Sequence, residues 1–210
     1  MNIQDDFSEK MLQDIVKQYK GQLFTLSSGY KSPVYCDNRV ITSLPEFRSF
    51  LKNYLTDLIK QNFKSIDAIV PVATGAIAMG TLVADQLNLP SVPVHPKHQI
   101  IGSRVEGYLK KGSNIVIYED LISKGDSVAE VIVYLRKKGH HVLGVVTSFE
   151  YGFDTTKKRY TVWGVPVYAF TNLENLCLVA EKTKIWDPGF IELVKHFRRD
   201  PTRWHEYLKK

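Results

Sequence analysis

Short apolar runs alternate with helical segments through the middle of the chain, and this order constrains the fold more than any other feature. The runs that we expect to form strands are residues 68–72, 91–94, 114–118, 142–148 and 165–170. Helical spacing predicts helices over 75–87 and 127–138, the second closed by Gly139. Because the runs are continuously apolar, each strand should be buried on both faces. The sequence therefore predicts an α/β fold with a central parallel sheet flanked by helices.

The flanking segments have different patterns. Apolar residues at helical spacing predict an amphipathic helix over 7–20, and the β-prone runs 23–26 and 34–36 predict a hairpin or a pair of strands around a polar loop. Pro45 is expected to open a helix that ends near residue 61. The tail is expected to be helical, with breaks at Pro188 and Pro201.

No internal repeat, linker or low-complexity segment divides the chain. We therefore expect a single domain over residues 1–210. Within it we expect a small N-terminal hood (1–62), a parallel-sheet core (63–171) and C-terminal helices (172–210).

The charge balance favours a small polyanionic ligand over nucleic acid. The formal net charge is +6, but it comes largely from short basic clusters such as residues 157–159. No arginine-rich arm or basic stripe interleaved with aromatic residues is present, so no nucleic-acid partner is expected.

Cysteine usage and the N-terminus point to a cytoplasmic protein. Cys36 and Cys177 have no CxxC spacing, which argues against a disulfide framework and against a zinc site. The acidic N-terminus lacks the apolar region of a signal peptide, and no run approaches about 18 apolar residues, so no membrane partner is expected.

Residues 115–127, IVIYEDLISKGDS, have the pattern of a ligand-binding site. A predicted buried strand ends in Glu119 and Asp120, and a short loop with Gly125 and two hydroxyls then leads into a helix. Carboxylates accept hydrogen bonds from sugar hydroxyls, and backbone N–H groups at a helix N-terminus bind anions. The pattern favours a ribose-phosphate site at the end of the sheet. A strand end followed by an acidic helix cap is the plainer alternative.

This run resembles the phosphoribosyl-diphosphate (PRPP) signature of type I phosphoribosyltransferases. The resemblance implies that fold, and a PRPP site made by Glu119, Asp120, Leu121, Ile122, Ser123, Lys124, Gly125, Asp126 and Ser127. It also implies that Ala73, Thr74 and Gly75 contact pyrophosphate. Taken alone, the 73–75 segment is more often just a tight turn.

Residues 24–39 resemble the N-terminal segment of orotate phosphoribosyltransferases. That resemblance implies an orotate site made by Ser28, Gly29, Tyr35, Cys36 and Ser123. Core packing is the alternative role for Tyr35 and Cys36. Ser27 stands where many members have a PRPP-contacting lysine, and Lys31 is the candidate replacement.

The resemblance continues through residues 147–153 and 199–204 and so covers essentially the whole chain. Residues 151–153, Tyr-Gly-Phe, stand where other members carry an orotate-binding arginine.

The chain departs from the family pattern in a loop and in the signature. The family's mobile loop reads close to Arg-x-Lys-x-Lys-x-His-Gly, whereas this chain aligns His95 with the arginine, Gln99 with the second lysine and Ile101 with the histidine. The remaining cationic candidates for pyrophosphate are Lys97, His98 and Arg104.

In the signature, Lys124 and Asp126 replace threonine and glycine. A carboxylate beside a phosphate is unfavourable unless Lys124 neutralises it.

The resemblance implies an enzyme that transfers phosphoribosyl from PRPP to orotate, with Glu119, Asp120 and Lys97 as catalytic residues and with His95, Lys97 and Lys31 also contacting PRPP. It implies Mg²⁺ held mainly by PRPP and water, with no direct side-chain ligand, and a homodimer whose loop reaches the neighbouring subunit. Two alternatives stay open: a non-catalytic PRPP- or nucleotide-binding paralogue, and a phosphoribosyltransferase for another base.

Overall fold

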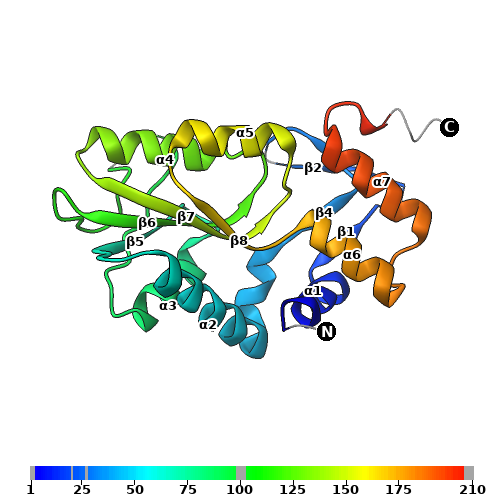
Figure 1. Cartoon of the computed structure of the whole chain (residues 1–210), viewed down its shortest axis with the longest axis horizontal. Coiled ribbons are helices and arrows are strands. Elements are labelled where there is room, and N and C mark those ends of the chain that lie inside the picture. The colour runs from blue at the N-terminus through cyan, green and yellow to red at the C-terminus, as the bar shows by residue number, and fades with distance from the viewer. Residues whose placement is uncertain (1–2, 20, 27, 98–102, 206–210) are drawn as a thin grey trace.

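A four-stranded parallel sheet forms the centre of the molecule (Figure 1). The computed structural model describes residues 3–19, 21–26, 28–97 and 103–205, with the side chains of residues 3 and 4 left aside. The sheet has the order β5 (Ala68–Pro71), β6 (Asn114–Ile122), β7 (His141–Glu150) and β8 (Val167–Asn172). The predicted α/β fold with a parallel sheet is confirmed.

The expected strand over 91–94 is reduced to isolated parallel bridges beside β5, Ile69 with Ser91 and Val72 with Val94. Val92 and Val94 still donate backbone hydrogen bonds to Ile69 and Pro71, at 3.0 and 2.9 Å. Pro93, which lies between them, faces the opposite side, where its carbonyl oxygen accepts from the Glu106 N–H at 2.9 Å.

Helices cover both faces of the sheet (Figure 1): α2 (Pro45–Asn62) and α3 (Ile77–Gln86) lie below it, and α4 (Asp126–Lys137) and α5 (Asp154–Trp163) lie above. Alternate residues of β6 therefore enter two different cores. Val116 packs in the same core as residues of α2 and α3, whereas Ile115 and Ile117 pack with residues of α4. Burial on both faces explains why the strands are continuously apolar.

Sequence reasoning missed α5. Its sequence, DTTKKRYTVW, buries only Thr156 and Trp163, and so shows no apolar stripe at helical spacing.

The N-terminal segment forms a small hood with two separate strand pairs. The helix expected over 7–20 is α1 (Ile3–Asp14), and it ends earlier because Val16–Gln18 is a strand, β1, that pairs with β4 (Val34–Cys36). Strands form in both of the β-prone runs 23–26 and 34–36, but not as a hairpin with each other, because β2 (Phe24–Thr25) pairs with β3 (Lys31–Ser32). A 3-10 helix, η1 (Asn38–Ser43), then leads into α2.

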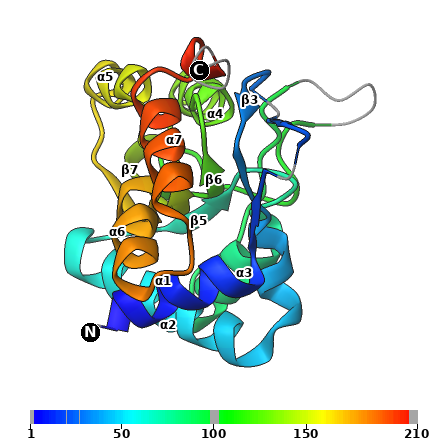
Figure 2. The same cartoon turned by 90° about the vertical axis from the view of Figure 1, so that its right-hand side faces the viewer.

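The C-terminal helices α6 (Leu173–Thr183) and α7 (Pro188–Arg199) lie against the hood (Figure 2). Phe7 of α1 stacks on Phe47 of α2 with ring centroids 3.7 Å apart and meets Phe170 of β8 edge-on. Trp204 is fully buried, and its Nε1 donates to the Lys31 carbonyl oxygen at 2.8 Å. The end of the described chain is thereby joined to the hood. None of the helices within the described ranges is both long and apolar enough to cross a membrane.

Candidate functional site

The acidic pair lies inside β6 instead of following it, because β6 continues to pair with β7 as far as Ile122 and Glu150. The neighbouring strand β5 ends earlier, opposite Tyr118. The segment from Glu119 onward therefore has β7 on one edge and no β5 on the other, which leaves that side of the pair for a ligand.

Both carboxyl groups lie in surroundings that disfavour their charge. Glu119 is only 6% exposed, and burial, together with the neighbouring Asp120, raises its pKa well above the ordinary value. Burial also raises the pKa of Asp120. The Asp120 N–H donates to Glu119 Oε1 at 3.1 Å. The pair is therefore suited to partners that supply hydroxyl donors or positive charge.

The loop after β6 leads into the N-terminus of α4, as predicted. Gly125 adopts a φ of 76°, and a Cβ there would lie 2.8 Å from the Trp163 ring, so glycine is required both by the turn and by the packing. Thr156 Oγ1 donates to the Ser123 carbonyl oxygen at 2.7 Å. Thr156 of α5 thus anchors the loop, and the first N–H groups of the 12-residue helix α4 lie beside it.

Lys124 does not neutralise Asp126. Lys124 Nζ donates to the Ser28 carbonyl oxygen at 2.6 Å and lies 4.0 Å from the centroid of the Tyr30 ring. Asp126 instead forms its ion pair with Arg159 of α5, whose Nη1 also donates to the Lys124 carbonyl oxygen at 3.2 Å. Sequence reasoning treated Arg159 as part of a solvated basic cluster. The pairing of Arg159 with Asp126 was not expected, because α5 was not recognised as a helix.

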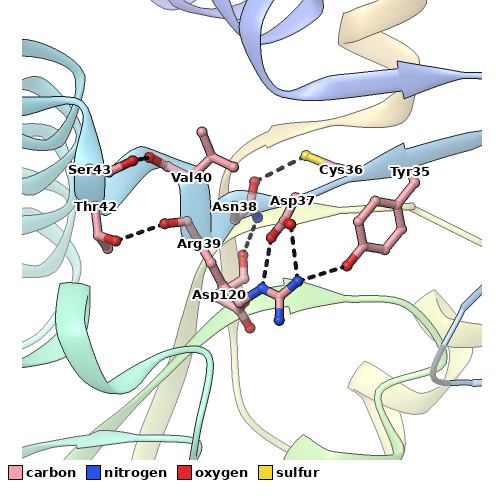
Figure 3. A network of polar contacts seen from close by, with 9 residues as sticks. All are labelled: Tyr35, Cys36, Asp37, Asn38, Arg39, Val40, Thr42, Ser43 and Asp120. Atoms are coloured by element: carbon pink, nitrogen blue, oxygen red, sulfur yellow. Dashed lines mark hydrogen bonds and ion pairs between the residues drawn. The ribbon is translucent and has the colours of Figure 1, made fainter.

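The segment 35–39 brings the hood to the acidic pair (Figure 3). Asn38 Nδ2 donates to the Asp120 carbonyl oxygen at 2.6 Å, and Cys36 Sγ donates to Asn38 Oδ1 at 3.0 Å. Burial raises the pKa of the Cys36 thiol well above its ordinary value, with Asp120 and Asp37 adding to the shift, so the thiol is neutral.

Sequence reasoning gave no role to Asp37, Asn38 or Arg39. The signal available was three consecutive polar residues directly after a β-prone run. Arg39 Nε and Nη2 donate to Asp37 Oδ1 and Oδ2 at 2.7 and 3.0 Å, and Nη2 also lies 3.3 Å from the Tyr35 hydroxyl (Figure 3).

The turn at residues 73–75 also reaches the acidic pair. The Ala73–Thr74 peptide bond is cis. A Cβ built on Gly75 would lie 2.5 Å from Asp120 Oδ2 and 2.9 Å from its Cγ, so the backbone approaches the carboxylate as only glycine permits.

Two adjoining cavities collect most of the expected site residues. The hood cavity, about 420 Å³, takes in Tyr35 and Cys36 together with the 73–75 turn and Asp120. The loop cavity, about 560 Å³, takes in Ser28, Lys97 and the loop from Ile122 through Ser127. Both cavities are lined by the same four residues at their junction: Glu119, Leu121, Ser123 and Ser127.

Tyr151, the first residue of the Tyr-Gly-Phe segment, also lines the hood cavity. It is fully buried, and burial raises the pKa of its hydroxyl, so the side chain stays neutral and, unlike an arginine, offers no positive charge to an anion.

Three expected site residues line neither cavity: Gly29, Lys31 and His95. Lys31 Nζ donates to Thr25 Oγ1 at 2.7 Å, and His95 pairs with Glu106.

At the base of the 95–106 loop, Arg104 Nε donates to the His95 carbonyl oxygen at 2.8 Å, and its guanidinium lies 4.3 Å from the centroid of the Tyr134 ring. Of the three cationic candidates, Lys97 lines the loop cavity, and Arg104 lines neither the loop cavity nor the hood cavity. His98, like Gln99 and Ile101, lies outside the described residues.

Comparison with known proteins identifies the family. No family model matches the chain. An orotate phosphoribosyltransferase from Bacteroides fragilis is 40% identical over 206 residues, which are 97% of each chain. A solved orotate phosphoribosyltransferase from Aeropyrum pernix is 26% identical with a TM-score of 0.71, over 88% of this chain and 100% of that one. The UMP synthase of Leishmania donovani shares the fold, with a TM-score of 0.79 at 23% identity, over 94% of this chain and 42% of that one. The acidic pair, the loop ahead of α4 and the hood thus lie in a chain that belongs to the orotate phosphoribosyltransferases.

Proposed function

We propose that the chain transfers the phosphoribosyl group of PRPP to orotate, giving orotidine 5′-monophosphate and pyrophosphate. The observation that carries the proposal is the junction of the two cavities at Glu119 and Ser123. A base in the hood cavity and a phosphate in the loop cavity would place the ribose between them, beside the acidic pair.

In the reaction, the bond between C1′ and the pyrophosphate oxygen breaks, and the bond between C1′ and N1 of orotate forms. Pyrophosphate takes the bonding electrons, and N1 gives up its proton. Glu119 and Asp120 would accept hydrogen bonds from the ribose hydroxyls and stabilise positive charge that develops on the ribosyl ring. Hydroxyl donors would offset the burial that raises the pKa of both carboxyl groups in the free protein.

The loop of residues 123–127 would bind the 5′-phosphate through its backbone N–H groups and the N-terminus of α4. The pairing of Asp126 with Arg159 supports this assignment, because it offsets a carboxylate that would otherwise repel the phosphate.

Negative charge on the leaving pyrophosphate requires cations. Lys97, at the edge of the loop cavity, would supply one, and the 73–75 turn would approach the pyrophosphate through its backbone. The orotate ring would lie in the hood cavity beside Tyr35, Cys36 and Ser123, and Ser28 would meet it only from the loop cavity, where its hydroxyl accepts from that of Ser123.

The carboxylates at the cavity also fit Mg²⁺ that arrives with the substrate. Mg²⁺ commonly binds through one or two carboxylates plus substrate phosphates and keeps several waters. Within the described ranges no group of three His, Cys, Asp or Glu side chains is placed to hold a metal, whereas Glu119 and Asp120 offer two carboxylates at the cavity. When bound, Mg²⁺ would neutralise charge on pyrophosphate. The carboxylates would face it with water or ribose hydroxyls between.

The test is an assay of PRPP, MgCl₂ and orotate that follows the loss of orotate by its ultraviolet absorbance. We expect turnover, and we expect Lys97→Ala to lower kcat by about 10²–10³-fold, the effect of losing one charge contact in the transition state. Lys111→Ala, an exposed lysine that lines neither cavity, is the matched control and should leave kcat unchanged. Absence of turnover with PRPP binding preserved in calorimetry would favour a non-catalytic paralogue instead.

We also propose a homodimer in which the 95–106 loop reaches the neighbouring subunit. Tyr108, 81% exposed directly after this loop, offers apolar surface for such a contact. Light scattering coupled to gel filtration tests the dimer.

A further inference from the structure

The hood cavity is lined by three carboxyl groups, those of Asp37, Glu119 and Asp120. Among the described residues that line it, Arg39 is the single cationic side chain. Lys97 and Lys124 line the loop cavity instead, and Lys124 is already bound to the Ser28 carbonyl oxygen. An anion that enters the hood cavity therefore depends on Arg39 for its counter-charge.

The Arg39 guanidinium is held in place by residues of its own segment. Asp37 binds it through two oxygens, at 2.7 and 3.0 Å, and the Tyr35 hydroxyl lies 3.3 Å from Nη2. The remaining nitrogen, Nη1, has no hydrogen-bond partner in the described part of the chain. In Figure 3 the guanidinium lies between the Tyr35 ring and Asp120, with Nη1 turned away from Asp37. An oriented donor at a cavity wall loses little conformational entropy when an acceptor arrives.

The base in the proposed reaction is itself an anion. Orotate carries a carboxylate on its pyrimidine ring, and moving that carboxylate next to three acidic groups is unfavourable without a cation. Arginine binds carboxylates through charge-assisted hydrogen bonds from a planar set of donors.

We propose that Arg39 binds the carboxylate of orotate through Nη1, and that this contact makes the hood cavity specific for a carboxylated pyrimidine. Asp37 and Tyr35 act as positioning residues that orient the guanidinium. The inference rests on the proposed function, since it assigns the base to the hood cavity.

The experiment compares wild-type protein with Arg39→Gln and Arg39→Lys, using orotate and, in parallel, uracil, which has the same ring without the carboxylate. Arg39→Gln should raise KM for orotate about 10- to 100-fold, the range for one hydrogen bond to a charged group. KM for PRPP should stay within about twofold, and the preference for orotate over uracil should fall by the same factor as the orotate KM rises. Arg39→Lys keeps the charge and should recover part of the loss.

Arg136→Gln, an exposed arginine on the last turn of α4, controls for net charge and should change neither KM. A rise in KM for PRPP with orotate unaffected would assign Arg39 to pyrophosphate and overturn the inference. If neither KM changes, Arg39 only forms a surface ion pair with Asp37, and the inference is overturned as well.

The wild-type arm separates this inference from the proposed function. If wild-type protein does not turn over orotate, calorimetry with orotate in the presence of PRPP decides between the two. If the wild type binds orotate and Arg39→Gln does not, Arg39 remains the carboxylate site and the proposed enzymatic activity is rejected. Absence of orotate binding by the wild type would reject both.

Discussion

Substitution of Gly75 by alanine tests whether close backbone approach to Asp120 matters for catalysis. The added methyl group would lie 2.5 Å from Asp120 Oδ2, whereas ordinary contact begins at 3.4 Å, so the carboxylate must move by about 0.9 Å. A displacement of about 1 Å at a reacting centre costs roughly 10²-fold in rate, or about 2.7 kcal/mol of transition-state stabilisation. We therefore expect kcat/KM for PRPP to fall about 100-fold in the steady-state assay. Folding should survive, because Gly75 does not have a positive φ and alanine suits its backbone.

Gly189→Ala is the matched control. Gly189 also lacks a positive φ and also faces an aspartate, since a Cβ there would lie 3.0 Å from Asp187 Oδ1, but it lies at the start of α7, outside both cavities. Its kcat/KM should equal that of the wild type. If Gly75→Ala retained kcat/KM within about threefold of wild type while folding normally, the position of Asp120 would not limit the reaction and the reasoning would fail.

The other predictions concern charge at the site. Burial raises the pKa of Glu119 in the folded protein, so the folded state loses stability as pH rises above the ordinary carboxyl range. Glu119→Gln should therefore raise Tm at pH 8, and the difference in Tm from the wild type should vanish near pH 4. Glu192→Gln should do the reverse and lower Tm at pH 8, because hydrogen bonding to Lys195 lowers the pKa of that carboxyl; equal Tm changes in both variants would contradict the argument. Arg159→Gln should raise KM for PRPP about fivefold at low salt and less at high salt, since it leaves Asp126 unneutralised, and adding Asp126→Asn should restore it. A double variant no better than Arg159→Gln would show that Arg159 acts independently of Asp126.

The fold class was predictable because it depends on local pattern. Strands buried on both faces are continuously apolar, and their alternation with helices leaves a parallel sheet as the expected arrangement. The pairing of β1 with β4 was not predictable, since β-prone runs show that strands exist and not which strands become neighbours. Helix α5 was missed because it covers the sheet with only two buried side chains.

Much of the candidate site was also visible in short motifs. Residues 119–127, the 73–75 turn and Tyr35 with Cys36 were all identified from the sequence, and the structure brings them to two adjoining cavities. Lys31 was selected by its proximity in sequence to Ser27, but its ammonium group binds Thr25 instead of lining a cavity. A side chain of that length can point in several directions from one backbone position, and the motif does not specify which.

The sequence by itself determined the family and the parallel-sheet fold, because both depend on residues that are neighbours along the chain. Only the tertiary structure decided which charges meet. Asp126 pairs with Arg159, 33 positions away, and Asn38 binds the carbonyl of Asp120, 82 positions away. Coulomb and hydrogen-bond energies depend on distance in space, so Arg39 became a candidate ligand of the base only when the fold placed it on the wall of the hood cavity.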